Sequence, residues 1–101
     1  MNKKENRLNL DQLRELLETT HRFPGGYTIK VIGRADDDFA DRVVAVARER
    51  LGRPGDVQTT CRATPHGRHV SVTVQLSVIT ADEVLVVYEA LQAVQGVTML
   101  L

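Results

Sequence analysis

The sequence is poor in several residue types, and each shortage removes a class of function. Cys61 is the single cysteine among 101 residues, so no disulfide forms within the chain and we expect a reducing, cytoplasmic environment. Aromatic residues make up only 4% of the chain, so the core must be aliphatic. The 13 basic and 13 acidic residues give a formal net charge of zero, which provides no broad attraction to nucleic acid or to an anionic membrane.

Long apolar runs are missing as well. No segment approaches the ~20 apolar residues that a membrane span requires, and no apolar signal core follows the charged residues 1–7. A chain of 101 residues suits one small domain, which we divide into a helical arm at residues 1–22 and a folded domain at residues 23–101. Domains of this size are only modestly stable alone, so we expect a symmetric homodimer.

The most informative stretch that is present runs from His69 to Ile79. Apolar and polar residues alternate strictly along it, which predicts a strand with one face on a core and one face in water. Val74, in the middle of the apolar face, is expected to be buried. The apolar residues of this stretch are Val70, Val72, Val74, Leu76 and Val78.

The remaining segments supply what covers this strand. Periodicity, capping residues and turns predict the order strand, helix, strand, strand, helix, strand after Pro24. Right-handed crossovers and a tight hairpin then give an α+β, ferredoxin-like fold: a four-stranded antiparallel sheet, first and third strands central, with two helices on one face. In the last strand, Val97, Met99 and Leu101 are expected to face the core. The predicted segments are 27–33, 36–51, 57–64, 69–79, 80–95 and 97–101.

A further helix is expected at residues 8–21, ahead of the domain. Asn9 and Gln12 form a capping pair, and Leu10, Leu13 and Leu17 make one apolar stripe. Two interpretations remain open for this stripe. It packs on its own domain, or it binds a partner protein.

Several chemistries lack the residues they need. The open face of the predicted sheet would carry no aromatic side chain to stack a base, which argues against RNA binding. Cys61, His66 and His69 do not have the spacing of a zinc motif, and we expect the histidines in solvent. No nucleophile with a base and no carboxylate pair stands out. We therefore expect a protein that is not an enzyme and needs no metal or cofactor.

Four stretches resemble the YbeD family of small bacterial proteins, in order and in spacing. The resemblance covers nearly all of residues 15–101. It implies an ACT-like fold, similar to the amino-acid-sensing regulatory domains of biosynthetic enzymes, and a link to lipoate regulation. The stretches are Phe23–Gly33, Thr64–Val74, Tyr88–Leu91 and Val97–Leu101.

Two functions follow from this sequence. The first is a regulatory module that senses a small metabolite such as an amino acid, and the second is an adaptor that uses the Leu10, Leu13 and Leu17 stripe and a sheet edge. For a sensor, we expect the ligand at Gly33, Arg34, Ala35 and Asp36. Glycine allows close approach, a helix start and Arg34 favour a carboxylate, and aspartates favour an amino group. Together they would favour a zwitterion.

Overall fold

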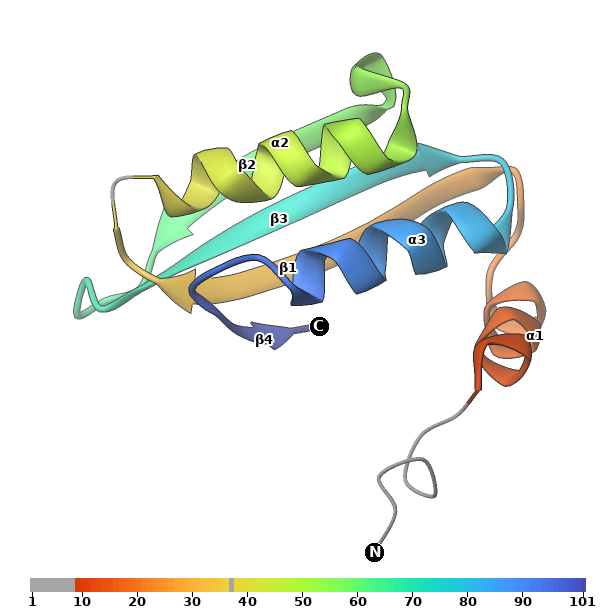
Figure 1. Cartoon of the computed structure of the whole chain (residues 1–101), viewed down its shortest axis with the longest axis horizontal. Coiled ribbons are helices and arrows are strands. Elements are labelled where there is room, and N and C mark those ends of the chain that lie inside the picture. The colour runs from red at the N-terminus through yellow and green to blue at the C-terminus, as the bar shows by residue number, and fades with distance from the viewer. Residues whose placement is uncertain (1–8, 37) are drawn as a thin grey trace, which may run out of the picture.

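The computed structural model describes residues 9–36 and 38–101, and it confirms the predicted α+β architecture (Figure 1). A short 3-10 turn, Pro54–Asp56, is the one element between α2 and β2. The helices and strands, in chain order, are α1 (Leu10–Thr20), β1 (Gly25–Arg34), α2 (Phe39–Leu51), β2 (Val57–Ala63), β3 (His69–Val78), α3 (Ala81–Gln92) and β4 (Val97–Leu100).

The four strands form one antiparallel sheet in the order β2-β3-β1-β4. The first and third strands are central, as predicted, and β2 is an edge strand. Figure 1 shows α2 and α3 side by side over one face of this sheet, while the other face is left open. This is the ferredoxin-like arrangement expected from two interleaved strand–helix–strand crossovers joined by a hairpin.

The core lies between the sheet and the two helices. The apolar faces of β1 and β3 supply Ile29, Val31, Val72, Val74 and Leu76, and the inner sides of the helices cover them. Val74 has no exposed surface, so its predicted burial is confirmed. Burying an aliphatic side chain of this kind contributes about 1.5–3 kcal/mol. The helical residues of the core are Phe39, Val43, Ala47, Leu51, Val84, Val87 and Leu91.

The helix ends are set by capping side chains and by a glycine. Asn9 and Gln12 form a reciprocal capping box at α1, and α2 stops at Gly52, whose φ of 76° suits glycine. At α3 the hydroxyl of Thr80 accepts from the Glu83 amide, but the Glu83 carboxylate accepts from the amide of Ile79 instead of returning to Thr80. Within the described part of the chain, no helix is long and apolar enough to cross a membrane.

The orientation predicted for β4 is confirmed at Val97, which packs against the core, and is wrong at Met99 and Leu101. The pairing of β4 with β1 shifts between Ile32 and Gly33, so that Val97 lies opposite Gly33 while Met99 lies opposite Ile32. One extra residue in β4 reverses the alternation beyond that point. Leu100 therefore packs against the core, and Met99 and Leu101 are 51% and 65% exposed.

The helix α1 packs near the start of α3 (Figure 1). Leu17 contacts the core, Leu13 is half-buried, and Leu10 and Leu16 are exposed. Arg14 of α1 forms an ion pair with Asp82 of α3. One end of the leucine stripe thus packs on the domain, and the other end is exposed to solvent. Residues 1–8 of the predicted arm, including the expected helix start at residue 8, lie outside the described residues.

Candidate functional site

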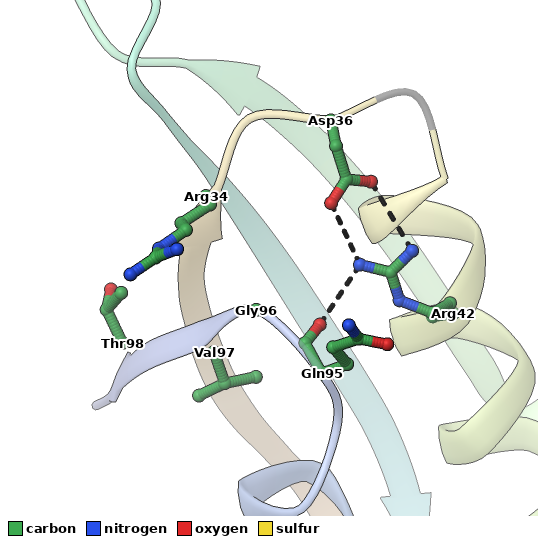
Figure 2. Close-up of a pocket in the computed structure, with 7 residues that line it drawn as sticks. All are labelled: Arg34, Asp36, Arg42, Gln95, Gly96, Val97 and Thr98. Carbon is green, nitrogen blue, oxygen red and sulfur yellow. Dashed lines mark hydrogen bonds and ion pairs between the residues drawn. The ribbon is translucent and has the colours of Figure 1, made fainter.

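A cavity of about 340 Å³ lies at the end of the sheet where β1 finishes and β4 begins (Figure 2). Three segments that are distant in the sequence meet there: the loop after β1, the first turns of α2, and the turn from α3 into β4. The antiparallel pairing of β1 with β4 brings the first and last of these together, since the Arg34 amide donates to the Gly96 carbonyl at 3.0 Å. The lining residues are Arg34, Asp36, Arg42, Gln95, Gly96, Val97 and Thr98.

Arg42, in the first turns of α2, links the three segments. Its Nη2 lies 3.0 Å from Asp36 Oδ2 and 3.0 Å from the backbone oxygen of Gln95, and its Nη1 lies 3.4 Å from Asp36 Oδ1. The guanidinium carbon is 5.8 Å from the centroid of the Phe39 ring, a cation–π distance. The buried Nε has no hydrogen-bond partner among the described residues. The fork–fork pairing fixes the guanidinium at the cavity wall.

Asp36 caps the start of α2. Its Oδ1 accepts from the Asp38 amide at 2.9 Å, and its backbone oxygen accepts from the Phe39 amide at 3.4 Å. Asp38 occupies the N-cap position without a side-chain cap bond. The hydrogen bond from Arg42 holds the pKa of the Asp36 carboxyl below its usual value. Of the three consecutive aspartates at this helix start, Asp36 provides the capping oxygen, and Asp37 lies outside the described residues. One amide that was expected to be free for a ligand is therefore already bonded.

Gly33 and Ala35 shape the loop but do not line the cavity. Gly33 is buried, and a Cβ there would lie 2.7 Å from the Gly96 carbonyl oxygen and would overlap the Phe39 ring. The close approach predicted at this glycine is thus occupied by the protein's own aromatic ring and backbone. Ala35 is exposed, and its amide donates to the carbonyl of Arg68 at 3.0 Å. Of the four predicted ligand residues, the structure brings Arg34 and Asp36 into one pocket.

Arg34 supplies a second guanidinium to this pocket. Its side chain is exposed and forms no ion pair with any residue in the described ranges. Figure 2 shows it directed toward Thr98, whose hydroxyl donates to the Ile32 carbonyl at 3.1 Å. Arg42 lies across the pocket on a different element. The pocket therefore holds two positive groups and one carboxylate, and the carboxylate is already paired.

Sequence reasoning missed Arg42 and the residues that enter from the α3–β4 turn. One signal was available for Arg42, because a cation in the first turns of a helix opposes the helix dipole unless a carboxylate compensates it. The predicted topology also places the start of β4 beside the end of β1. Gln95 and Thr98 could have been assigned to this corner from that topology alone.

The predicted interaction residues lie away from this pocket. Leu10, Leu13 and Leu17 belong to α1, which contacts the beginning of α3, whereas the pocket takes its residues from the turn after α3. Cys61, His66 and His69 were also weighed as metal ligands. Within residues 9–36 and 38–101, no three His, Cys, Asp or Glu side chains are grouped so as to hold a metal ion.

Known proteins match this chain over most of its length. The family described as "Protein of unknown function (DUF493)" matches residues 18–101. A UPF0250 protein of Shewanella amazonensis is 37% identical over 75 residues, which cover 74% of this chain and 83% of the relative. UPF0250 proteins of Shewanella frigidimarina and Shewanella loihica are 41% and 39% identical over 75 residues, with the same coverage.

Proposed function

The chain belongs to the DUF493 family, as its resemblance to the YbeD family predicted, and we propose that it is a non-enzymatic regulatory module that binds a small metabolite. The proposed site is the pocket of Arg34, Asp36 and Arg42, and the proposed ligand class is an amino acid or a similar small acid. The observation that carries the proposal is the convergence of two guanidinium groups and one carboxylate on a single cavity.

The charge pattern favours a ligand with a carboxylate. Asp36 compensates Arg42, so Arg34 leaves the pocket with one positive charge in excess among its described lining. A guanidinium binds a carboxylate through two parallel hydrogen bonds, which gives direction as well as attraction. The Gln95 side chain and the exposed Asp36 edge supply acceptors for an amino group. A cavity of about 340 Å³ has room for such a molecule.

The same groups suit binding better than chemistry. A general base must exchange a proton near the working pH. Asp36 is held ionised by its bond to Arg42, which lowers its pKa, and a guanidinium keeps its proton. The Thr98 hydroxyl donates to a backbone carbonyl. The pocket thus offers fixed charges and hydrogen-bond donors, which is what a sensing site requires.

The test is a titration of isotope-labelled protein with the twenty standard amino acids and lipoate, followed by amide chemical shifts. We expect one or a few of these compounds to shift Arg34, Asp36 and Gln95 in a saturable manner. Arg34→Gln should weaken that binding about tenfold or more, which corresponds to about 1.4 kcal/mol. Arg48→Gln is the matched control, because Arg48 is exposed on α2 and does not line the pocket.

Binding that Arg34→Gln and Arg48→Gln weaken equally would reject the pocket. Absence of saturable shifts with every compound would reject the sensor. A sensor should also gain thermal stability with its metabolite, because a ligand that binds only the folded state stabilises it by mass action.

A protein adaptor is the second candidate, favoured by the exposure of α1. Leu10 and Leu16 are 55% and 51% exposed on a helix that already contacts the domain through Leu17. We propose Leu10 and Leu13 as the surface that a partner protein would cover in this case. Leu10→Ser should then abolish capture of a partner and leave every metabolite titration unchanged.

We also propose a homodimer that forms through the β2 edge. The β2 strand has no lysine and no proline to block pairing with a second copy. Pairing through the open sheet face is less favourable, since that face carries Lys30 and Arg62 and would bring like charges together. Sedimentation of the wild type and of Thr60→Pro measures this, and a monomer at high micromolar concentration would reject the dimer.

A further inference from the structure

The open face of the sheet is positively charged, although the chain as a whole is neutral. None of the strands β1, β2, β3 and β4 contains an aspartate or a glutamate. Lys30 stands on the face opposite the core, because Ile29 and Val31 on either side of it are buried. Arg62 stands on the same open face, because it lies opposite Ser71, whose neighbour Val72 is buried. The acidic residues of the described chain lie in helices and loops. The net charge of the whole chain is therefore zero, although the charged residues of the sheet itself are all basic.

This face is hollowed over β1, β3 and β2. A cavity of about 340 Å³, distinct from the one at Asp36 and Arg42, lies there. The strand register aligns its residues in two rows: Lys30 lies opposite Thr73, which lies opposite Thr60, and Ser71 lies opposite Arg62 in the next row. The lining residues are Lys30, Thr60, Cys61, Arg62, Ser71 and Thr73.

The polar side chains of this cavity have capacity for a ligand. No ion pair joins Lys30 or Arg62 to a described residue, and the side-chain hydrogen bonds between described residues do not include the hydroxyls of Thr60, Ser71 and Thr73. Adjacent strands are about 4.8 Å apart. Lys30 on β1 and Arg62 on β2 therefore lie on either side of the β3 hydroxyls, and their long side chains can reach a ligand bound there. The cavity thus presents two cations and three hydroxyl donors with no competing carboxylate.

We propose that this cavity binds the phosphate group of a small phosphorylated molecule. A phosphate oxygen accepts hydrogen bonds from hydroxyls, a lysine supplies a compact positive charge, and an arginine supplies a fork that matches two phosphate oxygens. Binding here is independent of the pocket at Arg34 and Asp36. The cavity is open to solvent, so the organic part of the ligand extends away from the sheet.

The experiment titrates isotope-labelled full-length protein with inorganic phosphate and with glycerol 3-phosphate at constant ionic strength. We expect saturable amide shifts at Lys30, Arg62 and Thr73, with the ester binding at least as tightly as inorganic phosphate. Lys30→Gln and Arg62→Gln should each weaken binding about tenfold. Arg48→Gln, which removes the same charge from α2, should leave the affinity unchanged within about twofold.

Three results would overturn the proposal. The first is equal weakening by Arg48→Gln, which indicates general charge screening. The second is a shift pattern centred on Asp36 and Gln95, which assigns the anion to the other pocket. The third is tight binding of a short oligonucleotide without saturable binding of either phosphate probe, which makes the face a nucleic-acid surface. Should Lys30→Gln fold poorly, Arg62→Gln and Ser71→Ala test the same site from the other strands.

Discussion

Two arginine clusters connect α2 with α3, one at each end of α2, and they differ in how completely their hydrogen bonds are used. We name them after their central residues. The Arg42 cluster consists of Arg42, Asp36 and Gln95, and the Arg53 cluster consists of Arg53, Asp56, Ser77 and Glu83. The Arg42 cluster joins α2 to the turn after α3, and the Arg53 cluster joins the loop after α2 to the first turn of α3 and to the end of β3.

In the Arg53 cluster, all three guanidinium nitrogens of Arg53 have hydrogen-bond partners. Nε of Arg53 lies 2.7 Å from Asp56, while Nη1 and Nη2 lie 2.6 and 3.0 Å from the two oxygens of Glu83. This pairing raises the pKa of Arg53, and the hydrogen bond from Arg53 lowers the pKa of Glu83 to about 2. One cation faces two carboxylates, so the cluster has no need of an anionic ligand.

The Arg42 cluster has the opposite balance. Arg42 meets one carboxylate, its Nε is without a partner in the described chain, and Arg34 adds a second cation to the same cavity. The comparison shows that the two clusters differ in charge balance, and the excess of positive charge at the Arg42 end is what supports the ligand site proposed there. Substitutions that affect one of the two clusters and leave the other intact test this difference.

The largest effect is expected from Gly33→Ala, beneath the Arg42 cluster. The added Cβ would overlap the Phe39 ring and the Gly96 carbonyl, and overpacking of this kind lowers the free energy of unfolding by about 3 kcal/mol. Urea denaturation measures the loss. Gly55→Ala, next to the Arg53 cluster, is the control, because a Cβ there meets nothing within 4 Å and should change stability by about 0.5 kcal/mol at most. Equal stability of the two variants would contradict the packing of Phe39 over Gly33.

Val74→Ala should have the next largest effect, since it weakens the core that both ends share. Val74 is fully buried in the middle of β3, and the loss of two methyl groups with the cavity they leave should cost about 2 kcal/mol. Val86→Ala, at a position 48% exposed on α3, is the matched control and should cost far less. A cost near zero for Val74→Ala would place this face of the sheet in water.

A smaller effect, with a characteristic pH dependence, is expected from Glu83→Gln in the Arg53 cluster. The pKa of Glu83 is lowered to about 2 in the folded state, so its ion pair contributes stability above the unfolded pKa of about 4.3 and loses it as the pH falls toward 2. The pair is partly solvated, so its loss should cost about 1 kcal/mol at neutral pH.

Thermal unfolding from pH 7 to pH 2 measures this difference. The curves of wild type and Glu83→Gln should converge as the pH approaches 2, whereas Glu89→Gln, exposed on the same helix, should follow the wild type throughout. A difference that stays constant down to pH 2 would show that Glu83 acts through packing and not through its charge.

The smallest effect on stability should come from Arg34→Gln. Arg34 is exposed and forms no ion pair in the described part of the chain, so the free energy of unfolding should change by about 0.5 kcal/mol at most. A larger loss in chemical denaturation would assign Arg34 a structural role similar to that of Arg53. It would also remove the charge excess on which the distinction between the two clusters rests.

Most of the fold could be predicted because its signals are local. The alternation of β3, the capping pair Asn9 and Gln12 and the stop at Gly52 each depend on a few neighbouring residues. The orientation of β4 beyond Val97 could not be predicted, because the register shift against Ile32 and Gly33 depends on how two distant strands pair. Periodicity within four residues carries no information on such a shift.

The candidate site was predictable only in the segment that is continuous in the sequence. Arg34 and Asp36 lie between the end of a predicted strand and the start of a predicted helix, so they were found. Arg42 and Gln95 enter from other segments, and the bond between them exists only after the two crossovers are in place. The packing of the Phe39 ring over Gly33 could not be predicted either, since nothing in the sequence indicates that these two residues are in contact.

The position of Cys61 offers a practical advantage for testing the proposed pairing at the β2 edge. The thiol is exposed on β2 and is the only one in the sequence, and Cys61 lies opposite the buried Val72, so its side chain stands on the helix side of the sheet at the β2 edge. A thiol-reactive fluorophore would therefore attach at one defined point without prior mutagenesis. Its emission would report on events at the β2 edge, and a nitroxide at the same sulfur would measure how far a second copy of the chain lies from that edge.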